Sequence, residues 1–377
     1  MIDFWHMHRE GVKAMGWRLR IVTLFLALCC FMGFDAMGES KAYILMDLDT
    51  GRVLYEKNAD ERLAIASTTK IMTCLLALEN SALADRVTAS ENASGVPGTS
   101  IYLSVGETLS MEDMLYGLML RSGNDAAVAI AEHVAGSVEA FSNMMNERAG
   151  AIGADAYFTT PNGLDAGGNG ASARGITLIT REALFNPDFR RIVGTKKKTI
   201  PWTDHEYERV LTNKNKLLSD YEGAIGVKTG FTNKAGRCLV FAAERENMTL
   251  VGCVLNCYDW FDEAEKLLDK GFLEYDAKVF LEKGEIVDTI LVGGKKVRVA
   301  AGKTVKAPLK DGEKTDFKIE IEELSLPVLK GQIVGKASVV AGGDVIMTSD
   351  LVSMDTHEKP SFAGALKKVV SLWKFGG

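Results

Sequence analysis

Residues 66–78 have the sequence ASTTKIMTCLLAL, in which a serine and a lysine three positions apart lead into an apolar run. The run Ile71–Leu78 is apolar almost all round, which predicts a buried helix. The spacing places the Ser67 hydroxyl and the Lys70 amine on one face of that helix. A neutral lysine can activate a serine by taking its proton, provided that burial and nearby positive charge lower the lysine pKa. The same pattern also fits a helix cap beside a surface lysine.

Two tripeptides further along the chain add polar groups. Ser122-Gly123-Asn124 follows a predicted helix and can point a hydroxyl and an amide into a cleft. Its commoner meaning is a turn between helices, with Asp125 capping the second helix. Lys228-Thr229-Gly230 follows an apolar segment, and on a strand Lys228 and Gly230 face the same side. A cation and a hydroxyl there can hold a carboxylate, although an edge-strand lysine is the simpler interpretation.

Helix and strand signals alternate between residues 40 and 275. Ala42–Leu48 and Val53–Tyr55 flank an Asp-Thr-Gly turn, which predicts a β-hairpin. Further predicted segments are the strands Gly236–Ala243 and Thr249–Asn256 and the helices Met111–Leu120, Ala126–Val134 and Asp259–Leu273. Strands at both ends with helices between them predict an α/β (α+β) catalytic domain over residues 39–275. Its sheet is flanked by helices and joins the N- and C-terminal segments.

The pattern changes between residues 276 and 358, where short β-rich runs alternate with Gly, Lys and Asp turns. This predicts a second, small all-β domain. The runs are Ile286–Val292, Lys296–Ala300, Phe317–Ile321, Gln332–Val340 and Asp344–Val352. They contain no catalytic constellation, so a spacer or a protein-contact domain is the expected role.

Both ends of the chain carry signals about location. Basic residues precede the apolar run Ile21–Phe34, and the small residues Ala36 and Gly38 follow it. This predicts a signal peptide over residues 1–38, against the alternative of a buried N-terminal helix. Residues 359–377 place apolar side chains opposite lysines, which predicts a cationic amphipathic helix on a membrane surface. The alternative is a helix docked on its own protein.

Composition excludes several classes of protein. Hydrophobic residues make up 47% and charged residues 25% of the 377, as in a globular protein, and the formal charge is −6. A broad nucleic-acid-binding face is therefore not expected. The four cysteines beyond residue 38 are Cys74, Cys238, Cys253 and Cys257. They are too few for a disulfide framework and lack companion zinc ligands, so we expect buried thiols and no metal.

The three motifs, in this order, resemble the signature of active-site serine penicillin-binding proteins and β-lactamases. The chain as a whole resembles the D-alanyl-D-alanine carboxypeptidases, which are low-molecular-mass penicillin-binding proteins of the serine peptidase S11 family. The matching blocks are ASTTKIMT at 66–73, SGNDAA at 122–127, TPNGLD at 160–165 and GVKTGFT at 226–232. This family also has a β-rich second domain and an amphipathic C-terminal anchor. Ile65 stands where the family usually has proline, and Asn162 stands where it often has histidine.

The resemblance implies a fold like that of the serine β-lactamases and penicillin-binding proteins, and it implies roles for the motif residues. Ser67 attacks the carbonyl between two D-alanines of a peptidoglycan stem peptide, and Lys70 accepts its proton. Ser122 relays a proton toward the leaving amine. Asn124 orients Lys70 and the substrate amide. Water then releases the shortened peptide, and no cofactor is needed.

The same resemblance implies a binding site for the end of the substrate. Lys228 and Thr229 hold the terminal carboxylate, and Gly230 lets the ligand approach the strand closely. The backbone N–H groups of Ser67 and Phe231 form an oxyanion hole. Penicillin, which mimics the D-alanyl-D-alanine end, is then expected to acylate the serine and to act as an inhibitor.

Two other functions use the same residues. A β-lactamase needs a carboxylate that positions the deacylating water. Asp165 and Glu182 are the candidates, and neither lies in a Glu-x-x-x-Asn pattern. A catalytically silent scaffold of the cell envelope is the third interpretation, against which the presence of all the motif residues argues.

Overall fold

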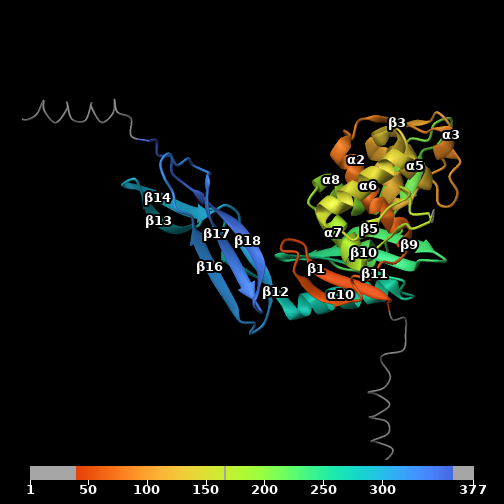
Figure 1. Ribbon diagram of the computed structural model, residues 1–377. Helices are drawn as coiled ribbons and strands as arrows, with labels where there is room; N and C mark the ends of the chain where they lie inside the picture. Colours follow the sequence, from red (N-terminus) through yellow and green to blue (C-terminus); the bar gives the residue numbers. More distant parts are fainter. Residues whose placement is uncertain (1–39, 165–166, 360–377) are drawn as a thin grey trace, which may run out of the picture.

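The computed structural model describes residues 40–164 and 167–359 (Figure 1). The predicted signal peptide, the predicted amphipathic helix from residue 360 onward and Asp165 lie outside the described residues. None of the helices in the described part of the chain is both long enough and apolar enough to cross a membrane.

A five-stranded antiparallel sheet forms the centre of the larger domain, in the order β2-β1-β11-β10-β9. Its strands are β1 (Ala42–Asp47), β2 (Val53–Lys57), β9 (Ala224–Thr232), β10 (Gly236–Arg245) and β11 (Met248–Leu255). The predicted hairpin and the predicted strand pair are both present. Since β1 pairs with β11, from Ala42 opposite Leu255 to Asp47 opposite Leu250, the sheet joins the two ends of the domain as predicted.

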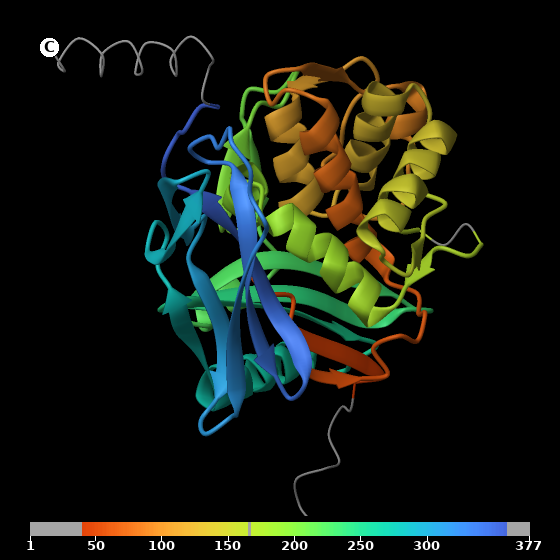
Figure 2. The same ribbon diagram turned by 60° about the vertical axis from the view of Figure 1, so that its left-hand side comes forward.

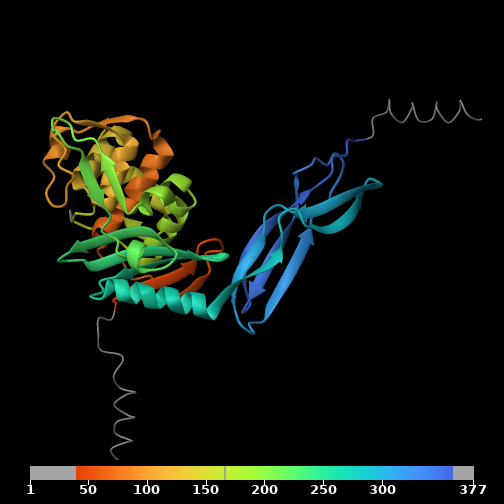
Figure 3. The ribbon, with the colours of Figure 1, turned by 180° about the vertical axis from the view of Figure 1, so that it is seen from behind.

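Helices cover both faces of this sheet, as Figures 1 and 3 show. The helix α10 (Trp260–Glu274) lies against one face together with the short α9, whose Leu217 belongs to the same core, and the main group of helices lies against the other. Alternation along β1 serves both layers, because successive side chains of a strand point to opposite faces. Ile44 and Met46 belong to the core shared with the main group of helices, whereas Leu45 belongs to the core beneath α10.

The main group of helices surrounds α2, which contacts α4, α5, α6, α7 and α8. The helices of this group are α2 (Lys70–Asn80), α3 (Glu91–Ser94), α4 (Met111–Leu120), α5 (Asn124–Ala135), α6 (Val138–Ile152), α7 (Ala173–Leu184) and α8 (Pro187–Val193), and α9 (Leu217–Asp220) lies on the α10 side. Short strands between them are β3 (Arg86–Thr88), β4 (Thr108–Ser110), β5 (Ala156–Tyr157), β6 (Gly170–Ala171), β7 (Lys197–Ile200) and β8 (Arg209–Thr212). Every residue from Ile71 to Ala77 is buried, which confirms the buried helix.

The second domain is all-β, as predicted (Figure 2). It contains a five-stranded sheet, in the order β13-β14-β18-β17-β16, and the separate pair β12-β15. The strands are β12 (Tyr275–Leu281), β13 (Ile286–Val292), β14 (Lys295–Ala301), β15 (Val305–Lys310), β16 (Thr315–Ile321), β17 (Ile333–Ala341) and β18 (Asp344–Ser353). The sequence did not predict β12 and β15. Proline weakens a strand pattern, but Pro308 is tolerated in β15 because a two-stranded sheet has only edge strands.

Ion pairs connect the two domains near the turn between β1 and β2. The Arg52 guanidinium lies 2.5 Å from the Glu313 carboxylate and also donates to the carbonyl of Pro308. The Lys306 amine lies 2.9 Å from the Asp49 carboxylate. These contacts hold the β-rich domain against the sheet side of the larger domain, away from the cavity described next.

Candidate active site

The three predicted motifs meet at one cavity of about 320 Å³. The residues that line it are Ser67, Thr99, Ser122, Lys214, Thr229, Gly230, Phe231 and Trp260. They come from the 3₁₀ turn before α2, the turn between α4 and α5, the edge strand β9 and three loops or helix ends. The fold therefore brings together residues that are far apart in the sequence.

Ser67 and Lys70 lie at the base of this cavity, in a slightly different local structure from the one predicted. Ser67 belongs to the 3₁₀ turn η1 (Ala66–Thr69), and Lys70 is the first residue of α2. The two side chains still share a face, because residues three apart are eclipsed in a 3₁₀ helix. Lys70 Nζ lies 3.1 Å from Ser67 Oγ. Ser67 is half-buried and reachable from the cavity, whereas Lys70 is fully buried.

The remaining contacts of Lys70 favour a neutral amine. Its Nζ donates to Asn124 Oδ1 at 2.8 Å and to the backbone oxygen of Asn162 at 2.6 Å. Both oxygens can only accept, so a neutral amine would give them its two hydrogens and direct its lone pair at Ser67 Oγ. Burial, and then the nearby charges of Lys228 and Lys214, hold the Lys70 pKa well below the usual lysine value. Lys70 can therefore act as a base toward the serine.

The turn between α4 and α5 supplies Ser122 and Asn124. The Asn124 amide is fixed in orientation because its Nδ2 donates to the carbonyl of Pro97, which leaves Oδ1 facing Lys70. Ser122 has a positive φ of 64°, and its Oγ is buried with no hydrogen-bond partner in the described part of the chain. A buried hydroxyl without a partner at a cavity wall is available to a ligand or to a proton in transit.

Asp125, the next residue, does not act as the simple helix cap that the turn interpretation suggested. Its carboxylate accepts the backbone N–H groups of Ile101 and Leu103 and the hydroxyl of Ser100. The same loop is joined to the motif again through Thr99, whose hydroxyl donates to the Ser122 carbonyl. Asp125 therefore fixes the loop that forms one wall of the cavity.

The opposite wall is the edge strand β9. Lys228 and Gly230 pair with Val240 and Cys238, which both belong to the core on the main helical side, so the two residues share a face as predicted. A Cβ atom at Gly230 would lie 3.1 Å from the Ser67 nitrogen and 3.0 Å from the Ile65 carbonyl oxygen. A side chain would therefore be crowded where the strand passes the backbone of the serine, and glycine allows this close approach.

Two lysines lie close to this wall, Lys228 and Lys214, and sequence analysis identified only Lys228 as a candidate site residue. Lys228 is buried, donates to the Thr229 carbonyl at 2.8 Å, and has its pKa lowered to about 7 by burial and by Lys214. Lys214 lies at the accessible rim, and partial desolvation followed by the charge of Arg121 lowers its pKa. Neither Lys214 nor Thr99 belongs to a motif, so no sequence signal pointed to them.

The loop after β5 closes the base of the site. Asn162 meets Lys70 through its backbone oxygen, so the contact does not depend on which side chain stands at this position. The adjacent Gly163 has a φ of +81°, and a Cβ there would lie 2.0 Å from the Ala66 carbonyl oxygen. Glycine lets this loop reach the backbone next to Ser67.

The described lining of the cavity contains no carboxylate. Glu182, one of the two candidates for a deacylating group, lies on α7 and pairs with Arg148 at 2.7 Å. Among the described residues, no group of histidine, cysteine and carboxylate side chains could hold a metal ion. The four described cysteines are buried and none of them forms a disulfide, which confirms the prediction of buried thiols.

A serine beside a buried lysine of lowered pKa, with a second buried lysine on the neighbouring edge strand, is the arrangement of an active-site serine hydrolase. Comparison with known proteins identifies the family of serine hydrolases to which the chain belongs. Residues 35–258 match the family model described as D-alanyl-D-alanine carboxypeptidase, and residues 275–359 match the model of the penicillin-binding protein 5 C-terminal domain.

Individual proteins of this family are similar to the chain over most of its length. D-alanyl-D-alanine carboxypeptidase DacF of Bacillus subtilis is 33% identical over 89% of this chain and 90% of its own length. DacC of Escherichia coli is 32% identical over 86% of each. The crystal structure of penicillin-binding protein 5 from Haemophilus influenzae superimposes with a TM-score of 0.71 at 29% identity, covering 85% of this chain and 98% of that one. The chain belongs to the D-alanyl-D-alanine carboxypeptidase family, the S11 serine peptidases of low molecular mass.

Lys228→Met should weaken the dependence of folding stability on pH. The unfolded chain holds the proton of Lys228 up to the ordinary lysine pKa, whereas the folded chain releases it near pH 7. Stability therefore rises with pH between these limits, by at most about 1.4 kcal/mol per pH unit for each such lysine. Urea unfolding at several pH values measures the slope. The exposed Lys303→Met is the control, and an unchanged slope in Lys228→Met would contradict the burial of its charge.

Proposed function

We propose that the protein removes the terminal D-alanine from peptidoglycan stem pentapeptides through an acyl-enzyme and thereby limits cross-linking. The observation that carries this proposal is the arrangement at Lys70, where two fixed acceptor oxygens orient a depressed-pKa amine toward Ser67 Oγ. Membership of the carboxypeptidase family supports the choice of substrate.

In the acylation step, Ser67 Oγ attacks the carbonyl between the two D-alanines while Lys70 takes the hydroxyl proton. The proton then passes by way of Ser122 to the departing amine. The unpartnered hydroxyl of Ser122 at the cavity wall supports this role. Asn124 keeps the Lys70 amine in place through the proton transfers.

The terminal carboxylate of the substrate lies, in this proposal, against the β9 wall. Thr229 lines the cavity there, while Lys228 lies behind it and Lys214 at the rim, so the wall carries a positive potential. The N–H groups of Ser67 and Phe231 receive the developing oxyanion. The close approach of Gly230 to the Ser67 nitrogen supports that pairing.

Deacylation distinguishes this proposal from a β-lactamase. After peptide cleavage the D-alanine leaves, and water can take its place. After attack on penicillin the leaving amine stays tethered to the adduct and obstructs the water. The absence of a carboxylate from the described lining supports slow release of penicillin, so β-lactams should act as covalent inhibitors.

We further propose an exported enzyme at the outer face of the cytoplasmic membrane. Residues 1–38 serve as the signal peptide, 39–275 as the catalytic domain, 276–358 as the β-rich domain and 359–377 as an amphipathic membrane anchor. The charge pattern of the two ends and the family relationship support this arrangement.

The parent protein should release D-alanine from a defined pentapeptide, and Ser67→Ala should abolish this release. Incubation with penicillin should add one intact penicillin per chain, on the peptide that contains Ser67. Enzymatic assay of D-alanine and mass spectrometry measure the two effects. Correctly folded parent protein that releases no D-alanine would favour a silent scaffold, and rapid turnover of penicillin without an adduct would favour a β-lactamase.

Lys70→Arg should be nearly inactive, because a guanidinium does not deprotonate in proteins. In the parent protein, acylation should rise with pH through an apparent pKa well below the usual lysine value, since only the neutral amine takes the proton. Stopped-flow acylation by a chromogenic β-lactam across a pH range measures both. An active Lys70→Arg enzyme would remove Lys70 from the role of base.

Lys228→Ala should reduce the preference for a peptide with a free C-terminal carboxylate over its C-terminal amide. Loss of a charge-assisted contact costs about 1.5–3 kcal/mol, or roughly ten- to a hundredfold in kcat/KM. Lys214→Ala is the matched variant at the rim of the same cavity. A preference that survives Lys228→Ala but is lost in Lys214→Ala would transfer the carboxylate contact to the rim lysine.

Deletion of residues 360–377 should abolish binding to anionic vesicles and leave turnover of small peptides unchanged, because the tail carries the predicted apolar and cationic faces. Co-sedimentation with vesicles compares two proteins that lack the signal peptide, one with residues 360–377 and one without them. If the protein that keeps residues 360–377 stays in the supernatant, the anchor is excluded.

A further inference from the structure

A hairpin beside the cavity ends in three packed aromatic rings that the mechanism does not use. The hairpin consists of β7 and β8, and its tip has the sequence PWTDHEYE at residues 201–208. Trp202 and His205 stack with ring centroids 4.2 Å apart. Tyr207 stands nearly perpendicular to both, at 5.5 Å and 5.6 Å, and is 64% exposed. We call Trp202, His205 and Tyr207 the aromatic tip.

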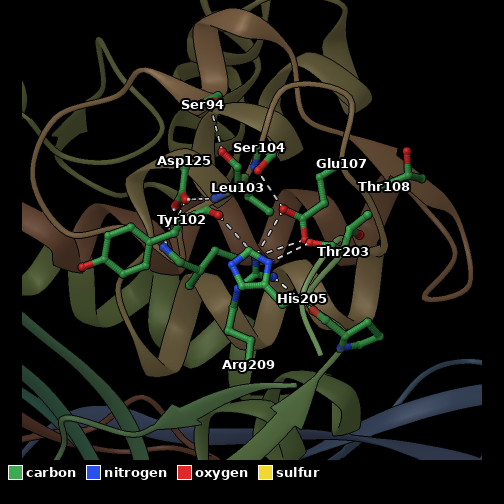
Figure 4. A network of polar contacts seen from close by, with 12 residues as sticks. Ser94, Tyr102, Leu103, Ser104, Glu107, Thr108, Asp125, Thr203, His205 and Arg209 are labelled. Carbon is green, nitrogen blue, oxygen red and sulfur yellow. Dashed lines mark hydrogen bonds and ion pairs between the residues drawn. The ribbon is translucent and has the colours of Figure 1, made fainter. Parts of the chain in front are cut away.

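The aromatic tip stands on a buried ion pair between Arg209 and Glu107, and Figure 4 shows this pair from close by. The Arg209 guanidinium lies 4.9 Å from the centre of the Trp202 ring. The same group donates to Glu107 at 3.0 Å and to the Tyr102 carbonyl at 3.3 Å, and both charged side chains are almost fully buried. The rings are therefore held in place before any ligand arrives, which lowers the entropic cost of binding.

The hairpin is continuous with the cavity on two sides. Thr99 lines the cavity and belongs to the same loop as Tyr102, the acceptor of Arg209. Lys214 lines the cavity and lies seven residues beyond Tyr207, at most about 23 Å along extended chain. In a stem pentapeptide, four residues separate the last peptide bond from the sugar, and they span roughly 14 Å when extended. The length of the stem peptide falls within this upper limit.

The chemistry of the tip fits a neutral, hydroxyl-rich ligand. Exposed carboxylates alternate with the rings at Asp204, Glu206 and Glu208. Aromatic faces pack against the apolar C–H face of a pyranose, and carboxylates accept hydrogen bonds from its hydroxyl groups. The three negative charges disfavour anionic lipid or nucleic acid. We propose that the aromatic tip binds a sugar ring of the glycan strand that carries the stem peptide. The choice of sugar rests on the proposed function.

The double variant His205→Ala/Tyr207→Ala tests this proposal and leaves Trp202 and Arg209 intact. Two substrates are compared, the free pentapeptide and the same pentapeptide attached to a soluble glycan oligomer. The parent should have the higher kcat/KM on the glycan-linked substrate. The double variant should lose this advantage, by roughly three- to tenfold for the rings removed, with unchanged kcat/KM on the free peptide. Phe185→Ala, at a 53% exposed aromatic residue on the end of α7, is the control.

A retained advantage in the double variant would overturn the proposal, as would an equal loss on both substrates, which would make the hairpin a structural support. If the double variant kept the advantage on the glycan-linked substrate but bound anionic vesicles less well than the parent, the tip would be a membrane contact. Titration with N-acetylglucosamine oligomers, followed by tryptophan fluorescence, tests the tip without catalysis. If the parent released no D-alanine but bound the oligomers through the tip, the proposed function would fail and the sugar site would stand. Absence of oligomer binding would overturn the sugar site alone.

Discussion

The burial of the Lys70 amine is the constraint on which the site depends. A charged amine without water costs several kcal/mol, and the cost falls when the amine is neutral and its hydrogens meet acceptors. Asn124 Oδ1 and the Asn162 carbonyl are those acceptors, and each is fixed by its own element. The turn between α4 and α5 and the loop after β5 must therefore meet at the start of α2. Around this amine the fold assembles the proposed base, its proposed nucleophile and one wall of the cavity.

Glycines at two positions make the approach of the other elements possible. Gly230 brings the edge strand against the Ser67 backbone, and Gly163 brings the loop after β5 against Ala66. A methyl group would collide with backbone at Gly163 and would be in tight contact with backbone at Gly230, and backbone moves aside less easily than a flexible side chain. The second cavity wall is fixed in another way, because Asp125 and the Arg209–Glu107 pair both hold the loop that contains Thr99. The wall that borders the reacting groups is thus continuous with the hairpin that carries the aromatic tip.

Much of the fold followed from local pattern. Alternation predicted the hairpin of β1 and β2, helical runs predicted α2 and α4, and turn residues predicted five of the seven strands of the second domain. The strands β12 and β15 were missed, since their patterns carry charge and a proline that only an edge position tolerates. At the site, the spacing of Ser67 and Lys70 was sufficient to predict their contact, because that contact is local.

The sequence by itself determined the motifs, the family and the layered α and β organisation, since these depend on residue type, short spacing and periodicity. Only the tertiary structure decided which groups meet at Lys70, because the Asn162 contact is made by a backbone oxygen and no side chain records it. It also placed Lys228 behind the cavity wall and brought Lys214 to the rim. Burial and long-range charge set these lysine pKa values, and neither quantity exists until the chain has folded.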